Sequence, residues 1–331
     1  MRIVERLRFV FQGAPAVLIA VLAISRPSLA QTHAEEGALQ SGNLAAAGLA
    51  IKNADWKGAE RELRQLLSSQ PQTPEPHFLL GYVLFREQLA TQSLAEYTAA
   101  ARLRQPNDDD LVVVASDYVL LKDYADAERW LLYATEHSPA NATAWYLLGR
   151  TQYNLDHTAA AAASFERRLQ LTPTDIRAEY NLGLALEKLD RPADAEAAYR
   201  NAIAWQKGAS TRDPQPYLDL GILLLSQHHA DRALPLLREA VDLGPQNPFA
   251  YQELGLAFEA LGRNTEAVAA LERATILAPG AEQPHFLLGR VYRRLGSMPA
   301  AAAQFAEVQR IAGSHSEKDT PNQTPLPEEA H

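Results

Sequence analysis

The chain has 331 residues, a formal net charge of −9 and no cysteine. An acidic chain is repelled by phosphates, which argues against nucleic acid and anionic membrane surfaces as general partners. The missing thiols exclude disulfides, thiol catalysis and zinc sites with thiolate ligands.

Residues 1–30 have the layout of a secretory signal peptide. Three arginines open the segment, an apolar run covers 14–24, and Ser28 and Ala30 present small side chains where a signal peptidase cuts. The apolar run is shorter than the ~20 residues that span a bilayer, so cleavage after Ala30 is favoured over an uncleaved anchor helix. We therefore expect an exported protein, with the periplasm as the favoured compartment and no membrane span after cleavage. Secretion and anchoring by an uncleaved N-terminal helix stay open as alternatives.

After a linker over residues 31–39, one pattern occurs eight times over residues 40–315. From the second unit to the eighth, the first segment has a Leu-Gly step, or Val114-Ala115 in the third unit, whereas the first unit is degenerate and has alanines there. In all eight units the second segment has a small residue followed four positions later by a bulky one. Apolar residues spaced three and four apart predict two amphipathic helices in each unit. The small residues of the second segments are Ala59, Ser93, Ala127, Ala161, Ala195, Ala233, Ala267 and Ala301. One such hairpin cannot bury its own apolar surface, so it needs copies of itself on both sides.

The period is 34 residues, with one interval of 38 between the fifth and sixth units. Four extra residues lie within 205–213, and we interpret them as a loop insertion, because surface insertions cost little. A break in superhelix curvature, or an exposed Trp205 that contacts a partner, is the alternative. The run 108–110 of three aspartates is expected to begin a helix rather than to bind a cation, since unpaired N–H groups there favour acids.

Residues 316–331 form an acidic, proline-bearing tail that we expect to be disordered. No further helix follows to cover the last unit. Phe305, Val308 and Ile311 are therefore expected to be partly exposed, which invites a partner or self-association.

The fourth unit carries the most complete form of the pattern. Its residues are Trp145, Leu148, Gly149, Ala161, Phe165 and Pro173, with Gln152 in a slot where a tyrosine is typical. In this order and at this period the chain resembles the tetratricopeptide-repeat family, over residues 40–315. The resemblance implies an all-α fold, a right-handed superhelical solenoid of antiparallel helix pairs. It also implies that the first helix of each unit lines a concave groove.

The groove positions implied by the resemblance carry aromatic and basic residues in the second, fourth and fifth units. Rings bury area at low entropic cost and guanidinium groups pair with carboxylates, so such neighbours make typical anchor sites. The alternative is that the rings pack between adjacent units. Leu44 and Gly48 take the places of the Lys and Asn that family members use to clamp a C-terminal carboxylate. The candidate partner-binding residues are Phe78, Tyr82, Phe85, Arg86, Tyr146, Arg150, Tyr153, Arg177, Tyr180, Asn181 and Lys188.

No catalytic motif is recognisable. The sequence has no His-Glu-x-x-His, no Gly-x-Ser-x-Gly and no phosphate-binding loop, and His228-His229 falls at an expected hairpin turn. We therefore expect no enzyme, no cofactor and no metal. The favoured function is a non-enzymatic protein–protein interaction module of the cell envelope that binds peptide segments of a partner protein in the concave groove. The alternative is a structural scaffold or self-associating assembly factor that docks through its uncapped C-terminal repeat.

Overall fold

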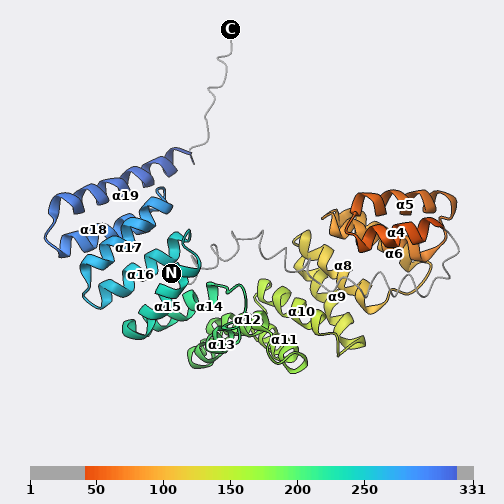
Figure 1. Ribbon diagram of the computed structural model, residues 1–331, viewed down its shortest axis with the longest axis horizontal. Coiled ribbons are helices and arrows are strands. Elements are labelled where there is room, and N and C mark those ends of the chain that lie inside the picture. The colour runs from red at the N-terminus through yellow and green to blue at the C-terminus, as the bar shows by residue number, and fades with distance from the viewer. Residues whose placement is uncertain (1–41, 319–331) are drawn as a thin grey trace, which may run out of the picture. The chain divides into compact units, whose positions relative to one another are not determined.

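The computed structural model describes residues 42–318, and all regular secondary structure in that range is helical. Sixteen helices, α4 to α19, follow one another along this part of the chain (Figure 1). They form an all-α stack of antiparallel helix pairs, which confirms the predicted fold class. The right-handed superhelix stays a prediction. The leader, the linker and the residues after 318 lie outside the described range.

The helices divide into two compact groups, each made of several repeats, which we call unit 1 and unit 2. The boundary between them in the sequence lies between Asp190 and Arg191. Unit 1 contains α4 (Gly42–Lys52), α5 (Trp56–Ser69), α6 (Pro74–Arg86), α7 (Ala90–Ala101), α8 (Asp108–Leu120), α9 (Tyr124–His137), α10 (Ala142–Asn154), α11 (Thr158–Leu171) and α12 (Ile176–Lys188). Unit 2 contains α13 (Pro192–Trp205), α14 (Gln215–Ser226), α15 (Ala230–Leu243), α16 (Pro248–Ala260), α17 (Asn264–Leu277), α18 (Glu282–Arg294) and α19 (Met298–Lys318). Helix α19 runs three residues past the expected boundary at 315.

The Leu-Gly steps are the points of closest approach between the two helices of a hairpin. A Cβ atom added to Gly149 would lie 2.7 Å from Cε1 of Phe165, and one added to Gly255 would lie 2.6 Å from Cγ of Leu271. Phe165 and Leu271 are themselves fully buried. The same contact occurs at Gly81, Gly221 and Gly289, so in these five hairpins the bulky residue of the second helix occupies the space that the glycine leaves, as the sequence pattern predicts.

Helix starts use local caps. The aspartate run begins α8, where Asn107 and Asp110 form a capping box: the Asp110 N–H donates to Asn107 Oδ1 at 2.9 Å, and the Asn107 N–H donates to Asp110 Oδ2 at 3.0 Å. Asp110 is thus engaged in the helix start, as expected for acids at this end. Between residues 42 and 318, no group of three or more His, Cys, Asp or Glu side chains is placed to hold a metal ion.

The loop between α13 and α14 carries the four extra residues. The buried Gln206 side chain donates to the Asp213 carbonyl at 3.1 Å and accepts from the Asp213 N–H at 2.8 Å. Trp205 at the end of α13 is half-buried. The Gln206 amide therefore joins the two ends of the loop, which is consistent with an insertion that leaves the flanking helices in place.

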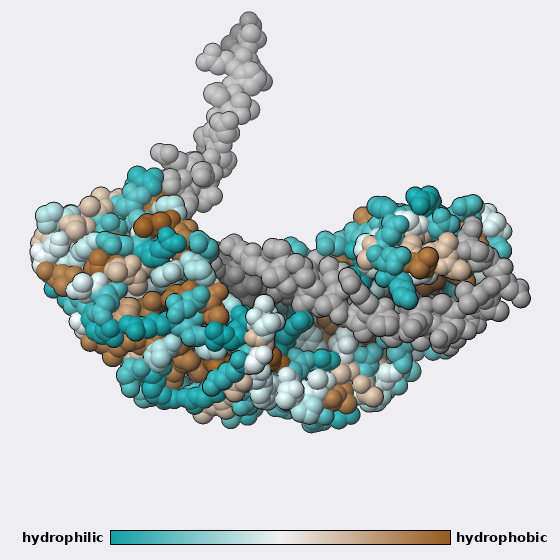
Figure 2. Space-filling model, viewed as in Figure 1, coloured by the Kyte–Doolittle hydropathy of each residue, from teal (hydrophilic) through white to brown (hydrophobic). Residues whose placement is uncertain are grey.

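The last hairpin differs in part from expectation. Phe305 and Val308 are half-buried, as expected, but Ile311 is only 2% exposed. The expectation of an accessible Ile311 is therefore wrong. The exposed apolar side chains of the last hairpin are Phe286, Leu295 and Met298, and Ile276 is exposed on the preceding helix α17. Figure 2 shows hydrophobic residues reaching the surface among hydrophilic ones on the helices of unit 2.

Asp117 on α8 is a carboxyl group in the core of unit 1, and sequence reasoning missed it. The 34-residue register could have revealed it, because the same slot holds Val83, Thr151, Ala185, Leu223, Ala257 and Val291 in other repeats. The side chain is fully buried, and neither oxygen receives a hydrogen bond, because the neighbouring Ser93 hydroxyl donates to the Gly81 carbonyl at 2.8 Å. Burial raises the pKa of Asp117 to about 8, against a lowering effect of Ser93.

Tyr97 on α7 shares this interior. Its hydroxyl is buried and has no hydrogen-bond partner. Burial raises the pKa of Tyr97 well above its usual value, and the nearby carboxyl groups of Asp110 and Asp117 add to that effect. Both Asp117 and Tyr97 are therefore held in their neutral forms in the folded chain at neutral pH.

We expect Gly255→Leu to lower the free energy of unfolding by ~1–3 kcal/mol, because the new side chain must displace Leu271 from a closely packed contact. Gly280→Ala is the matched control, since nothing lies within 4 Å of a Cβ at that position. Urea unfolding followed by circular dichroism measures both. Equal midpoints for the two variants would contradict the packing described here.

Asp117 also makes the stability of unit 1 depend on pH. Its carboxyl keeps its proton in the folded state up to about pH 8, whereas in the unfolded chain it loses the proton near pH 4. The folded state thus binds the extra proton between these values, and stability should fall as pH rises from about 4 to about 8, by at most ~1.4 kcal/mol per pH unit.

Asp117→Val, which copies the residue of the preceding repeat, should remove this component. Its stability advantage over the natural chain should grow from pH 5 to pH 8 in urea unfolding measured across that range. Glu136→Gln, on the exposed face of α9, serves as the control and should change nothing. A difference between Asp117→Val and the natural chain that stays constant with pH would show that Asp117 is charged in the fold.

Candidate functional site

All eleven candidate residues lie in unit 1, on the first helices α6, α10 and α12. Three of them are core residues: Phe78, Tyr82 and Phe85 are 0%, 6% and 4% exposed. They pack with the apolar residues of α4, α5 and α7. The sequence left two interpretations open for these rings, exposure in a groove or packing between adjacent repeats, and the structure shows packing. These three side chains therefore offer a partner little accessible area.

Arg86 at the end of α6 holds an aromatic pair together. Its guanidinium carbon lies 4.4 Å from the ring centroid of Trp56, and Nη1 donates to the Tyr82 hydroxyl at 2.9 Å. Trp56 and Tyr82 meet edge to face, with ring centroids 6.3 Å apart. Within residues 42–318, no carboxylate pairs with Arg86. Sequence reasoning missed Trp56, which begins the second helix of the first, degenerate repeat.

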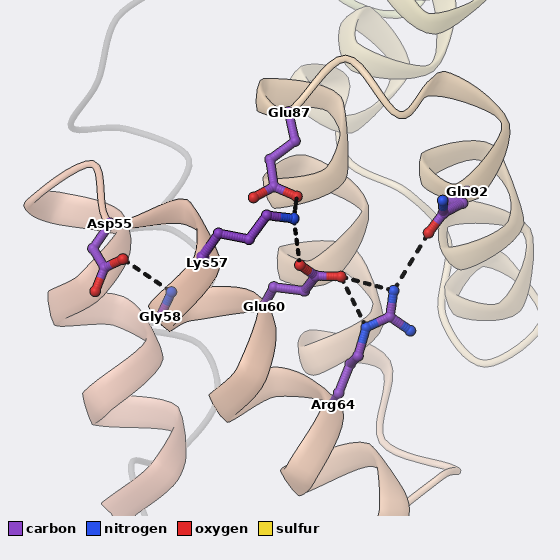
Figure 3. Close-up of polar contacts among 7 residues, drawn as sticks. All are labelled: Asp55, Lys57, Gly58, Glu60, Arg64, Glu87 and Gln92. Atoms are coloured by element: carbon purple, nitrogen blue, oxygen red, sulfur yellow. Dashed lines mark hydrogen bonds and ion pairs between the residues drawn. The ribbon is translucent and has the colours of Figure 1, made fainter.

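Beside this pair, the surface of α5 is a network of mutually neutralising charges (Figure 3). Lys57 donates to Glu60 at 3.0 Å and to Glu87 of α6 at 2.8 Å. Arg64 bonds Glu60 at 3.0 Å and reaches Gln92 of α7 at 3.4 Å. Exposed pairs of this kind contribute little stability each, and they leave no net charge for a partner.

A second arrangement joins α10 to α12, and we refer to its four residues, Tyr146, Arg150, Arg177 and Asn181, as the basic cluster. Asn181 Nδ2 donates to the Tyr146 hydroxyl at 3.4 Å and to the Arg177 carbonyl at 2.7 Å. The Arg150 guanidinium carbon lies 5.8 Å from the Tyr146 ring centroid. The structure thus brings together four residues that are up to 35 positions apart in the sequence.

The charges of the basic cluster act on the Tyr146 hydroxyl. Burial raises the pKa of Tyr146, while the positive charges of Arg150 and Arg177 work in the opposite direction. Neither arginine forms an ion pair with a carboxylate of the described chain. The nearby Asp175 is already committed, because it accepts from Arg168 at 2.8 Å and from the N–H groups that begin α12 at 3.0 Å.

The remaining candidates are Tyr153, Tyr180 and Lys188. The Lys188 ammonium lies 4.8 Å from the Tyr153 ring centroid and forms an ion pair with Asp156. That hydrogen bond lowers the pKa of Asp156 and leaves Lys188 largely neutralised. Tyr180 is half-buried on α12. Of the eleven residues, Arg86, Arg150 and Arg177 are therefore the cations without an ion pair to a carboxylate between residues 42 and 318, and two of these three belong to the basic cluster.

In unit 2, the arginine at the position equivalent to Arg150 is Arg290, and it is paired with a carboxylate. Glu259 of α16 is 6% exposed and accepts from Arg290 of α18 through two bonds, at 3.0 and 2.5 Å. Arg294 adds a third contact at 3.1 Å. A buried carboxylate therefore pairs with two arginines of the eighth repeat, whereas no ion pair joins Arg150 or Arg177 to a carboxylate between residues 42 and 318.

Comparison with known proteins places the repeats. A family model described as tetratricopeptide repeat matches residues 38–108, 115–176 and 218–282, and a second model with the same description matches 176–208. No curated protein matches the chain. None of the helices between residues 42 and 318 combines the length and apolar character needed to cross a bilayer.

Solved structures are similar in fold. PilW, described as a type IV pilus biogenesis factor, is 23% identical with a TM-score of 0.54, over 61% of this chain and 92% of PilW. Cut9 in the APC/C Cut9–Hcn1 assembly is 15% identical with a TM-score of 0.52, over 86% of this chain and 56% of that chain. YrrB, described as having an unusual peptide-binding site, is 19% identical with a TM-score of 0.49, over 57% and 97%.

Proposed function

Because the chain belongs to the tetratricopeptide-repeat family, we propose that it is a non-enzymatic interaction module that binds a peptide segment of a partner protein through the basic cluster of unit 1. The observation that carries this proposal is the pair Arg150 and Arg177, which flank a half-buried tyrosine without a carboxylate counter-ion in the described chain.

The chemistry of the basic cluster selects the kind of partner. Two guanidinium groups accept carboxylates in planar, paired geometry, and the Tyr146 ring offers apolar area beside them. The partner segment therefore combines a carboxylate with a neighbouring apolar side chain. Such binding depends on charge, so it weakens as salt concentration rises.

We further propose that the protein acts after export, in the cell envelope, with the signal peptide removed after Ala30. The support is the basic, apolar and small-residue order of the leader. Intact-mass measurement of the protein isolated from its native cells should give a mature species that begins at Gln31. A species that still begins near Met1 would establish the anchored form instead.

Self-association through the last repeat remains the alternative function. The exposed side chains of Phe286, Leu295 and Met298 favour it, and the burial of Ile311 counts against it. Apolar contact is less sensitive to salt than ion pairing. Assembly that persists at high salt would therefore favour this alternative.

Arg150→Ala and Tyr146→Ala should each weaken partner capture by more than ~1 kcal/mol, about fivefold or more, because anchor residues dominate such interfaces. Both side chains are partly accessible, so the helical circular-dichroism signal should survive each change. The matched control is Arg167→Ala on the second helix α11, whose guanidinium contacts only Gln170. Equal partner capture by Arg150→Ala and Arg167→Ala would show that the basic cluster does not bind the partner.

A further inference from the structure

Helix α9, the second helix of the third repeat, carries exposed apolar side chains on one face. Its buried side shares a core cluster with residues of α8 and α10. On the other side, Leu132 is 47% exposed and Tyr133 is 37% exposed. Helical spacing places both in one row with Arg129 and Glu136, which are also exposed. We call these four residues the α9 stripe.

The third repeat is exceptional in having large apolar side chains at these two places. In the seven other repeats, the residues in the slots of Leu132 and Tyr133 are polar, charged or no larger than alanine, as an exposed helix face normally is. Because both side chains lie partly in solvent, core packing does not require them to be apolar. In α5, α13 and α17 the same two slots hold Arg64-Gln65, Arg200-Asn201 and Glu272-Arg273.

Tyr133 is held in position by its neighbours on α9. Its ring meets Trp130 edge to face, with centroids 6.4 Å apart, and lies against the His137 ring, with centroids 3.9 Å apart. His137 Nδ1 lies 2.9 Å from the Tyr133 carbonyl oxygen, and Trp130 packs against the core of unit 1. A ring that is fixed in advance loses little conformational entropy on binding. Tyr133 therefore has the properties of an interface anchor.

The order of charges along the α9 stripe identifies its occupant. Leu132 and Tyr133 lie at the centre, Arg129 lies three positions before Leu132, and Glu136 lies three positions after Tyr133. We propose that two copies of this chain associate through the α9 stripe, with their α9 helices antiparallel about a two-fold axis. Leu132 of one copy then faces Tyr133 of the other, and Arg129 faces Glu136. The stripe is complementary to itself, as a two-fold interface requires.

Both charged residues of the stripe have capacity for this contact. Glu136 forms no ion pair within residues 42–318. Arg129 donates through Nη2 to Asp126 on its own helix, in an exposed pair of a kind that contributes little stability. The other donors of its guanidinium remain for a second carboxylate. Two ion pairs at the ends of the contact fix its register, while the apolar centre supplies contact area.

The pairing is expected to be weak and reversible, because four residues from each copy make a small interface. Urea unfolding is followed in dilute protein, where the copies are separate, so Glu136→Gln remains a neutral control there. The α9 stripe is distinct from the basic cluster on α10 and α12 and from the exposed residues of the last hairpin. This inference therefore does not depend on the proposed function.

Sedimentation velocity of the full chain over a range of concentrations tests the association. The natural chain should shift reversibly from monomer towards dimer as its concentration rises. Leu132→Arg/Tyr133→Asn, which copies the residues of α13, should weaken the association about tenfold or more, because the apolar centre is lost. Circular dichroism verifies that this variant is helical. Ile276→Glu is the matched control, since it removes an exposed apolar side chain from α17 and should leave the association unchanged.

Charge reversal tests the antiparallel arrangement itself. Arg129→Glu places glutamates opposite each other in a pair of identical copies, and Glu136→Arg places arginines opposite each other. Each variant alone should therefore associate about threefold to tenfold more weakly than the natural chain. An equal mixture of the two variants should recover the natural affinity, because each ion pair of the mixed dimer again joins an arginine to a glutamate. Recovery on mixing is a result that a misfolded variant does not give.

Three results would overturn the inference. The first is a natural chain that stays monomeric up to the highest concentration, and the second is an association that Leu132→Arg/Tyr133→Asn leaves unchanged. The third is a mixture of the charge-reversed variants that associates no more tightly than either variant alone. If Phe286→Ala/Met298→Ala abolishes the association and the α9 variants do not, the contact lies at the last hairpin. Partner capture through the basic cluster is measured separately and is unaffected by any of these results.

Discussion

The fold depends on the close approach of two helices at a residue that has no side chain. At Gly149 and Gly255 the neighbouring Phe165 and Leu271 fill the space where a Cβ would be, at distances that no Cβ could tolerate. This contact fixes the spacing and rotation of each hairpin. It consequently fixes which face of each first helix packs inward and which carries the side chains of the basic cluster.

Equivalent helix positions in the two units hold charge differently, and this difference gives the candidate site its character. In unit 2, the buried Glu259 binds two arginines of α18, so both of these arginines have a carboxylate partner within the fold. In unit 1, the Arg150 guanidinium lies against the Tyr146 ring, and neither Arg150 nor Arg177 forms an ion pair with a carboxylate between residues 42 and 318. A buried carboxylate destabilises the fold unless it is paired, so the arginines of α18 serve to stabilise Glu259 within unit 2. The unit 1 arginines are instead the residues that we propose to bind a partner's carboxylate.

Departures from the repeat pattern have local causes and local consequences. Asp117 stands where other repeats have apolar or small residues, and the fold accommodates it by keeping it protonated. The four extra residues before α14 are accommodated because Gln206 supplies the hydrogen bonds that a longer loop would otherwise lack. In both places the hairpins keep their register. A stack in which each repeat contacts mainly its neighbours can absorb such changes without altering distant repeats.

The sequence by itself determined the helices and their pairing, because the 34-residue period and the glycine positions record contacts between residues close in the chain. The family resemblance, rather than the spacing, indicated which residues would occupy groove positions. Only the tertiary structure decided which of them are accessible. Phe78, Tyr82 and Phe85 are buried against α4, α5 and α7, and the spacing of residues along α6 does not reveal what packs against that helix. The tertiary structure also decided which charges are balanced, because ion pairing depends on side-chain placement across helices. Arg150 and Arg290 look alike in the sequence and differ only in whether a carboxylate from another helix reaches them.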